Sequence, residues 1–311
     1  MNNTLQKFIK NAPKTDKKKV LMIDASNMMF RVLFITEKYS EGLDLDFDLF
    51  KHILVNELLN SIKKFKPDRV IFAYDDRNYW RKEVYADYKL TRASERAKST
   101  IDFDKYFENL NEFLPQLESA LPNVYFLRVE KCEADDIIAV AVKHIYTDSD
   151  IVNISTDKDY HQLMIDRDDY RQWNPIKKAF DNVANPKRAH EIKILTGDSS
   201  DYIKGIKKRC GPVTANKILD EGLEHYIENP NNKISASEKI DMRQRYEMNK
   251  VLIDFNHIPQ KYVNKIKEAH NNYEIGKYNG RKFYKFLMNS DIGGILDNMQ
   301  AVRNDLENIN A

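Results

Sequence analysis

Several residue types and patterns are scarce in this sequence, and each absence excludes a class of protein. Only nine glycines occur among 311 residues, less than half the usual share of about 7%, and no glycine-rich phosphate-binding signature is present. The two cysteines, Cys132 and Cys210, lack CxxC spacing and are too few for a disulfide framework. No hydrophobic run approaches the roughly 20 residues of a membrane helix, and residues 1–19 lack the apolar segment of a signal peptide. We therefore expect a cytoplasmic protein without a membrane segment.

The net charge is close to zero, but the charges are unevenly distributed. There are 50 basic and 48 acidic residues, and 42% of the chain is hydrophobic, enough to bury a core. Basic residues concentrate in residues 7–19, 77–98 and 204–217. Such runs are often solvated surface, but they also suit a partner rich in phosphate. The charge layout alone leaves both interpretations open.

The hydrophobic pattern predicts an α/β fold with a mostly parallel central sheet flanked by helices. The predicted strands are Val20–Asp24, Arg69–Tyr74, Val124–Leu127 and Ile151–Ser155, and the predicted helices between them cover 47–65, 103–117 and 134–145. Residues 78–100 are too polar for core, and no strand is predicted after residue 185. We therefore divide the chain into a flexible basic tail (1–19), an α/β domain (20–185) and a helical C-terminal region (186–311).

Acidic residues recur at the carboxyl ends of the predicted strands. Asp24 ends the first strand, Asp75 follows the second, and Asp157 and Asp159 follow the fourth. Others open the helix after the third strand or lie in the GDSSD segment: Glu133, Asp135, Asp136, Asp198 and Asp201. Because parallel strands end at one sheet edge, these carboxylates are expected to converge, with Asp198 and Asp201 at the i, i+3 spacing of one helix face. Each alone also fits a helix cap, the role we assign to Asp76 and Asp136.

A cluster of carboxylates repels itself, and bound cations are the natural compensation. Without histidine or cysteine nearby, hard oxygen ligands favour Mg²⁺ or Mn²⁺. Two such ions can stabilise the attacking and leaving oxygens of a phosphodiester displacement. The rival aspartyl-phosphate chemistry needs Asp-x-Asp at the first strand, and Ser26 stands where the second acid belongs. The pattern predicts metal-dependent phosphate chemistry without identifying the substrate.

Five ordered segments resemble the motifs of the flap-endonuclease and 5′-3′ exonuclease family: VLMIDASN (20–27), AYDDRNYWRKEVYADYKLTR (73–92), EADD (133–136), STDKD (155–159) and TGDSSD (196–201). With RYEMNKVLIDFNHIP (245–259), their order and spacing most resemble the replication ribonucleases H of T-even bacteriophages. The resemblance covers residues 20–295. It implies a PIN-like nuclease domain with an arch at 78–100 and a helix-hairpin-helix element in the C-terminal region.

The resemblance also implies an activity, namely Mg²⁺-dependent cleavage near 5′ ends and flaps of DNA and RNA/DNA hybrids at single-strand/duplex junctions. The enzyme would act as a monomer in phage DNA replication, in the bacterial host cytoplasm. The first metal site matches Asp24, Asp75, Glu133, Asp135 and Asp157, and the second matches Asp159, Asp198 and Asp201. Mn²⁺ is expected to substitute for Mg²⁺. Asp157, Lys89 and Arg92 are the implied catalytic residues, with Lys89 placed against the scissile phosphate.

Further implied DNA contacts come from the first helix and the arch. Phe30 and Arg31 match positions near the reacting phosphate, and Arg81, Lys89 and Arg92 supply cations in the arch. Tyr79, Trp80, Tyr85 and Tyr88 interleave with these cations, as suits stacking on single-stranded bases. The alternative is that Trp80 and Tyr85 pack the arch against the body.

The run GIKKRCGPVTA (205–215) falls at the family's helix-hairpin-helix loop. The resemblance implies a grip on duplex phosphates through Lys207, Lys208, Arg209, Gly211 and Thr214. In many members the carbonyls of this loop hold a potassium ion. Only one glycine of the usual GxG core is kept here, which counts against potassium binding.

The resemblance to phage enzymes also suggests two partner proteins, and two alternative functions remain open. The tail, through Leu5, Phe8 and Ile9, would dock on a sliding clamp unless it is only a solubilising extension, and the C-terminal region would meet the single-stranded DNA-binding protein. The alternatives are a catalytically silent, structure-selective DNA-binding protein and a PIN-type ribonuclease. The full acidic set counts against the first. The chain length and the basic arch count against the second.

Overall fold

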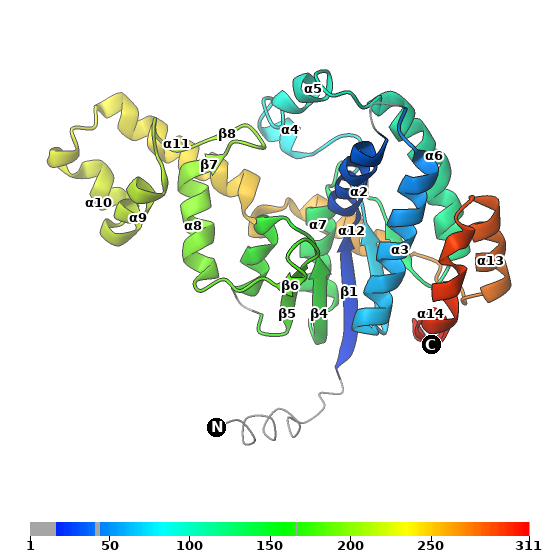
Figure 1. Ribbon diagram of the computed structural model, residues 1–311. Helices are drawn as coiled ribbons and strands as arrows, with labels where there is room; N and C mark the ends of the chain where they lie inside the picture. The colour runs from blue at the N-terminus through cyan, green and yellow to red at the C-terminus, as the bar shows by residue number, and fades with distance from the viewer. Residues whose placement is uncertain (1–16, 41–43, 166, 311) are drawn as a thin grey trace, which may run out of the picture.

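The computed structural model describes residues 17–40, 44–165 and 167–310, so the clamp-docking segment of the predicted tail lies outside the described residues. A six-stranded sheet forms the centre, in the order β3-β2-β1-β4-β5-β6 (Figure 1). Its strands are β1 (Lys18–Asp24), β2 (Arg69–Ala73), β3 (Tyr125–Leu127), β4 (Ser149–Ile154), β5 (Tyr170–Asn174) and β6 (Ala179–Phe180). All neighbours pair in parallel except β5 and β6. The predicted mostly parallel α/β fold is confirmed.

Strands β5 and β6 were not predicted, because the polarity of β5 hides its alternation. Its buried positions are Tyr170, Gln172 and Asn174, while Arg171 is exposed and Trp173 is partly exposed. Gln172 is buried because its amide donates to the carbonyls of Ser155 and Asp157, at 3.0 and 2.6 Å. A polar side chain that hydrogen-bonds backbone in this way can occupy a core position, and hydrophobicity alone does not reveal it.

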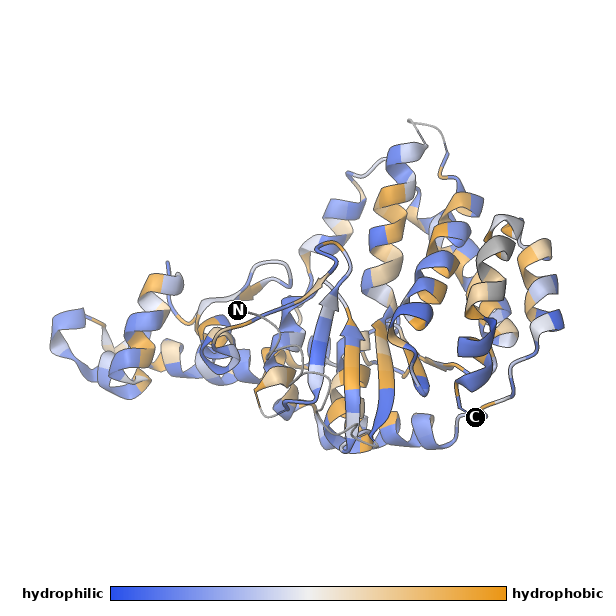
Figure 2. Ribbon diagram, turned by 60° about the horizontal axis from the view of Figure 1, so that its bottom comes forward, coloured by the Kyte–Doolittle hydropathy of each residue, from blue (hydrophilic) through white to orange (hydrophobic). Residues whose placement is uncertain are grey.

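Two layers of helices cover the sheet, one on each face. On one face lie α2 (Ala25–Tyr39), α3 (Phe47–Phe65), α6 (Phe103–Ala120), α13 (Gly280–Asn289) and α14 (Leu296–Asn308); on the other lie α7 (Ala134–Val140) and α12 (Gln260–Asn271). The side chains of β1 alternate between the two cores, with Leu21 and Ile23 in one and Val20 and Met22 in the other. Hydrophobic residues accordingly concentrate in the strands and the inward helix faces (Figure 2).

The predicted helices form with small differences at their ends. Helix α3 begins and ends where the sequence predicts, with Asp46 as its N-cap, and Asp102 caps α6 in the same way. Helix α7 is shorter than predicted, since a π-helical turn, Ala141–Ile145, replaces its last turns. The segment 78–100 contains only two short helices, α4 (Arg81–Val84) and α5 (Thr91–Arg96).

The remaining helices form a projection beside the sheet (Figure 1). Helices α8 (Pro186–Thr196), α9 (Pro212–Glu221), α10 (Leu223–Glu228) and α11 (Ala236–Ile253) surround a small third core. Two short strands, β7 (Gly197–Asp198) and β8 (Ile203–Lys204), pair after residue 185, where no strand was predicted. Helices α12 to α14 return to the sheet, and the predicted division at residue 185 stays a prediction. Within the described residues, no helix is both long and apolar enough to cross a membrane.

Candidate active site

Five acidic side chains meet at the carboxyl edge of the sheet. Asp24 ends β1, Asp75 follows β2, Asp157 follows β4, and Glu133 and Asp135 stand at the start of α7. All five line one pocket of about 170 Å³ together with Lys89 and Arg92. They converge because parallel strands present their carboxyl ends at the same edge. The structure therefore brings together the residues that the sequence assigns to the first metal site.

Hydrogen bonds from the chain itself hold these carboxylates in place. One oxygen of Asp24 accepts from the backbone N–H of Asn27, capping α2, and the other accepts from the Ser155 hydroxyl at 2.9 Å. Asp75 accepts from the N–H of Ala134 at 2.9 Å. Asp157 likewise caps the 3₁₀ turn Lys158–Met164. The helix-cap role and the place in the pocket are thus combined in the same side chains.

Most of this carboxylate group lacks a cationic partner. In the part of the chain that the structure describes, no lysine or arginine forms an ion pair with Asp24, Asp75, Asp135 or Asp157. Burial, reinforced by repulsion from Asp75 and Asp157, raises the pKa of Asp24 to about 7. Burial and neighbouring acids also raise the pKa values of Asp75 and Asp135. An uncompensated set of hard oxygen donors fits a divalent cation such as Mg²⁺ or Mn²⁺.

Glu133 differs from the other four because cations surround it. Arg81 contacts it at 2.7 Å, Lys89 forms a close ion pair with it, and the Tyr88 hydroxyl lies 3.0 Å away. Burial alone would raise the pKa of Glu133, but the charges of Lys89 and Arg81 outweigh it and lower this pKa to about 2. Glu133 is therefore held as a carboxylate by the base of the arch.

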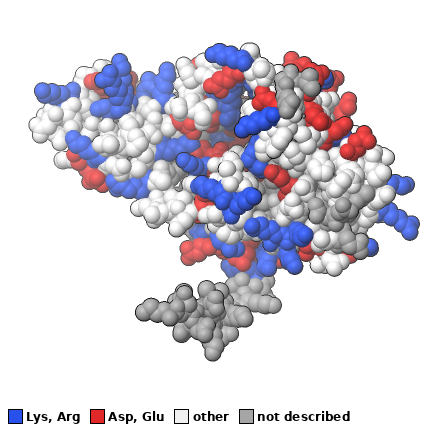
Figure 3. Space-filling model, viewed as in Figure 1, with Lys and Arg blue, Asp and Glu red and all other residues white. Residues whose placement is uncertain are grey.

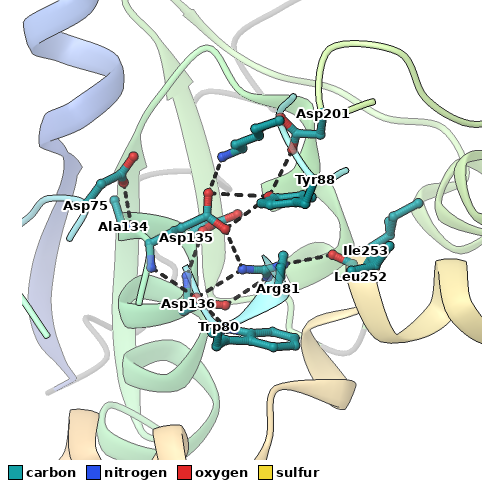
Figure 4. Close-up of polar contacts among 12 residues, drawn as sticks. Asp75, Trp80, Arg81, Tyr88, Ala134, Asp135, Asp136, Asp201, Leu252 and Ile253 are labelled. Atoms are coloured by element: carbon teal, nitrogen blue, oxygen red, sulfur yellow. Dashed lines mark hydrogen bonds and ion pairs between the residues drawn. The ribbon is translucent and has the colours of Figure 1, made fainter. Parts of the chain in front are cut away.

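Arg81 was assigned to DNA binding from the sequence, and the structure corrects this. Its side chain is only 3% exposed and pairs with Glu133 and with Asp136 at 2.8 Å. Its Nε also donates to the carbonyl of Leu252 at the end of α11 (Figure 4). A guanidinium enclosed by two carboxylates and a carbonyl cannot reach a phosphate. Arg81 instead joins the arch, the acidic pocket and α11.

Asp136 acts as the helix-terminal acid that the sequence predicts, and it also belongs to this buried network. It forms a capping box with Glu133, and it accepts hydrogen bonds from the indole of Trp80 at 2.9 Å and from Arg81. Asp76, also predicted as a cap, accepts from the backbone of Arg77, Asn78 and Lys131 and pairs with Arg128. Both acids are structural.

The aromatic residues of the arch divide into buried and accessible ones. Trp80 and Tyr88 are 1% and 2% exposed, so neither presents a face to a base. Residues 78–100 therefore contribute to the core, although their composition predicted otherwise. The partly buried Tyr85 packs with Tyr79 against a small cluster around Tyr88. Packing of Trp80 and Tyr85 against the body, one of the two alternatives, is the arrangement observed.

Lys89 and Arg92 project from the arch over the pocket, and both engage acids there. Besides its pair with Glu133, the Lys89 ammonium lies 3.9 Å from Asp201, and Arg92 contacts Asp201 at 2.9 Å. The backbone of Lys89 has a left-handed conformation (φ 57°), and its N–H donates to the Asp201 carbonyl. The turn that carries Asp201 therefore anchors the arch.

Within the second predicted group of acids, Asp198 and Asp201 do not share a helix face as their spacing predicts. Asp198 belongs to β7, and Asp201 lies in the turn before β8, because Asp198 accepts from the backbone of Ser200 and so bends the chain. Asp159 and Asp198 share Lys193 of α8, whose ammonium is 2.7 Å from Asp198 and in close contact with Asp159. The structure thus pairs Asp159 with Asp198 and directs Asp201 to the arch.

Charge in this second group is compensated. Burial and repulsion from Asp157 raise the pKa of Asp159 to about 6 despite the opposing pull of Lys193. For Asp198, Lys193 and the hydrogen bonds from Ser200 outweigh burial and lower the pKa to about 2. Lys193 was not predicted, since a lone lysine in a helix gives no signal in the sequence.

Of the two residues predicted near the reacting phosphate on α2, only Phe30 lines the acidic pocket. Arg31 forms a two-point ion pair with Glu57 of α3, at 2.6 and 2.5 Å. The guanidinium of Arg31 is therefore neutralised within the helical layer, and its predicted phosphate contact is not available in this arrangement.

The predicted hairpin lies between β8 and α9. Lys208 and Arg209 are exposed at its tip, and Gly211 is the N-cap of α9, with Thr214 in the first turn of that helix. Arg209 has a left-handed backbone (φ 59°), a conformation that glycine adopts more easily. Lys207 is partly held by the Tyr226 hydroxyl at 3.2 Å. Basic side chains gather over these projecting helices (Figure 3).

Several known proteins resemble this chain in sequence or in fold. Residues 19–200 match the family model described as the 5′-3′ exonuclease N-terminal resolvase-like domain. Ribonuclease H of Enterobacteria phage T4 is 27% identical over 83% of this chain and 88% of its own length. A 5′-3′ exonuclease of Mycoplasmopsis pulmonis is 26% identical, covering 74% and 76%. A bacteriophage T5 flap endonuclease, solved with DNA and metal ions, shares the fold at 19% identity with a TM-score of 0.61, covering 88% and 100%.

We predict that Arg81→Met lowers the free energy of unfolding by about 3–5 kcal/mol, because it leaves two buried carboxylates unpaired. Urea denaturation without metal measures this loss. The control is Arg77→Met, which removes an exposed arginine without an ion pair in the described residues and should change stability by less than about 0.5 kcal/mol. Wild-type stability with weakened DNA binding would restore Arg81 as a DNA contact.

The raised pKa of Asp24 predicts a pH dependence of stability in the metal-free protein. Between its ordinary value of 3.8 and about 7, the folded state holds a proton that the unfolded chain has released. Stability should therefore fall as pH rises through this window, by about 1.4 kcal/mol per unit for this group, and then level off.

Asp24→Asn should flatten this dependence when unfolding is followed from pH 4.5 to 8 in a chelator. The exposed Asp104→Asn should leave the profile as in the wild type. An unchanged slope in Asp24→Asn would show that Asp24 does not carry the strain of the pocket.

Proposed function

Because the chain belongs to the 5′-3′ exonuclease family and is thus a metal-dependent phosphodiesterase, we propose that it removes nucleotides from 5′ ends and cuts 5′ flaps at single-strand/duplex junctions. The substrates are DNA and RNA/DNA primers of phage replication. One observation carries the proposal: five carboxylates from four separate parts of the chain share a pocket that Lys89 and Arg92 also line. Such a pocket can hold a phosphate, with the carboxylates as metal ligands on one side and the positively charged side chains of Lys89 and Arg92 on the other.

We assign the first divalent ion to Asp24, Asp75, Glu133, Asp135 and Asp157, and the second to the group of Asp159, Asp198 and Asp201. Mg²⁺ is the proposed ion, with Mn²⁺ as a substitute, because all the donors are carboxylate oxygens. When bound, two such ions lower the pKa of the attacking water and stabilise both oxygens of the displacement. Ser155 and the N–H of Ala134 orient Asp24 and Asp75, so these ligands are placed before any ion arrives.

The cations of the arch act on the substrate rather than on the metal. Lys89 and Arg92 line the pocket, where they offset the negative charge that develops on the reacting phosphate. Phe30 lines the same pocket and offers a partly exposed ring to the terminal base. Lys208, Arg209 and the start of α9 hold the duplex phosphates about the hairpin. Binding at both places selects a duplex with an adjoining 5′ strand.

The relatives support the choice of substrate. They include a ribonuclease H of phage T4 and a T5 flap endonuclease in complex with DNA and metal ions. A replication role would bring a sliding clamp to the N-terminal segment and a single-stranded DNA-binding protein to the C-terminal helices, and both partners remain predictions. We do not propose potassium at the hairpin, because Arg209 replaces a glycine of the usual loop.

The test of the proposed function is an end-labelled 5′-flap duplex incubated with and without Mg²⁺, with the products sized. Wild-type protein should release the flap only with the metal. Asp135→Asn should cut about 10³-fold more slowly, because the metal contributes several kcal/mol to the reaction, while DNA binding persists. Glu130→Gln removes an exposed acid outside the pocket and is the matched control. Cleavage by Asp135→Asn at the wild-type rate and low Mg²⁺ would remove Asp135 from the mechanism, and binding without any cleavage would identify a silent binder.

A second prediction concerns the hairpin. Replacing Lys207, Lys208 and Arg209 together by alanine should weaken duplex binding and reduce its salt dependence, by a slope of about 1 for each phosphate that is no longer neutralised. Fluorescence anisotropy between 50 and 200 mM salt measures both quantities. The charge-matched control replaces Arg281, Lys282 and Lys285 by alanine. These residues lie on α13, at the other end of the molecule. Identical slopes for the two triple variants would exclude the hairpin as the duplex-binding element.

A further inference from the structure

Lys193 stands where the second group of acids would take a cation. It lies on α8 and reaches across to Asp159, which follows β4, and to Asp198 in β7. Its ammonium is 2.7 Å from Asp198 and in close contact with Asp159. The side chains of both acids are only 15% exposed. An ammonium held by two carboxylates from different elements therefore fills the space between them.

Within the described parts of the chain, four of the five acids in the first group have no such occupant. Asp24, Asp75, Asp135 and Asp157 form no ion pair with a lysine or arginine over the residues described, and only Glu133 of that group does. The two groups thus differ in electrostatic state before any metal arrives. Four acids of the first group have no cationic partner among the described residues, and the second group already holds a positive charge.

A divalent ion and an ammonium cannot share the same pair of carboxylate oxygens. Mg²⁺ requires oxygens at about 2.0–2.1 Å in near-octahedral geometry, and an ammonium within hydrogen-bonding distance of those oxygens would meet the ion with like charge. Binding in the second group must then displace Lys193. Asp24, Asp75, Asp135 and Asp157 of the first group require no such exchange, because no lysine or arginine is paired with them in the described residues and neutral donors such as Ser155 hold their oxygens.

We infer that Lys193 is a built-in cation that competes with the second divalent ion, so that the two ions bind in order and with different affinities. The first ion binds the uncompensated group. The second binds only as Lys193 leaves Asp159 and Asp198, and Lys193 becomes free for a phosphate at that moment. Lys193 is therefore a positioning residue that sets the affinity of the second site. This inference rests on the proposed metal-dependent function.

The test is the binding of Mn²⁺ to the full chain without DNA, followed by calorimetry and by the spin-resonance signal of free Mn²⁺. Wild-type protein should show one tight and one weak step. Lys193→Met should tighten the weak step by about tenfold, as expected when a close competing charge pair is removed, and leave the tight step unchanged. Lys187→Met, on the exposed part of the same helix, should match the wild type. An unaltered weak step in folded Lys193→Met would overturn the inference.

Two further measurements keep the outcomes distinct. Lys193→Arg retains the charge and should keep the weak step weak, which separates competition from a loss of packing. If Lys193→Met does not fold, the lysines of the wild-type protein can be ¹³C-methylated and followed by NMR. The Lys193 signal is assigned by its absence in Lys193→Arg. It should shift during the second binding step and not during the first. A shift confined to the first step would contradict the order of binding. Absence of both steps would instead refute the proposed metal-dependent function.

Discussion

The crowding of carboxylates at the carboxyl edge of β1, β2 and β4 is the constraint on which the rest of the site depends. Partly buried negative charges a few ångströms apart repel each other strongly in a medium less polar than water. They stay together because neutral donors fix them: Ser155 and Asn27 on Asp24, and Ala134 on Asp75. Since these donors belong to the sheet edge and to helix N-termini, the fold itself maintains the repulsion. A proton, as the raised pKa of Asp24 indicates, or a cation that enters the pocket relieves this repulsion.

A buried ion-pair network extends this constraint to the arch and the C-terminal helices. Arg81 satisfies Glu133 and Asp136, and its third contact is the carbonyl of Leu252, far along the chain. Removing any one partner would leave buried charge unpaired, which costs more than the pair itself contributes. The arch is therefore fixed at its base, while its outer residues, such as Leu90, are exposed. A rigid base with an exposed outer segment fits the proposed function, in which Lys89 stays aligned while a strand passes.

The sequence predicted the parts of this arrangement that depend on periodicity and topology. The hydrophobic pattern predicted four parallel strands and three of the covering helices. Because parallel strands end at one edge of the sheet, it also predicted that Asp24, Asp75, Asp135 and Asp157 converge. It failed where a side chain's role depends on its distant partner. Arg81 reads as a surface cation until Glu133 and Asp136 enclose it, and Gln172 in β5 reads as solvent-exposed until it binds the Ser155 carbonyl. Asp198 and Asp201 have helical spacing, but the hydrogen bonds of Asp198 to Ser200 favour a turn. Neither the composition nor the hydrophobic pattern of the sequence reveals these long-range and turn-forming contacts.

The cations around the pocket make substrate and metal binding mutually supportive. In the metal-free structure Lys89 neutralises Glu133, and Arg92 neutralises Asp201. A phosphate that enters between them competes with these carboxylates for the same two side chains. As each cation turns toward the phosphate, the oxygens of Glu133 and Asp201 lose a partner and become better ligands for a divalent ion. The reverse also holds, because linkage between two binding events is reciprocal. Under the proposed function, the arch cations therefore neutralise Glu133 and Asp201 at rest, and these two acids become available to a metal only as nucleic acid draws the cations away.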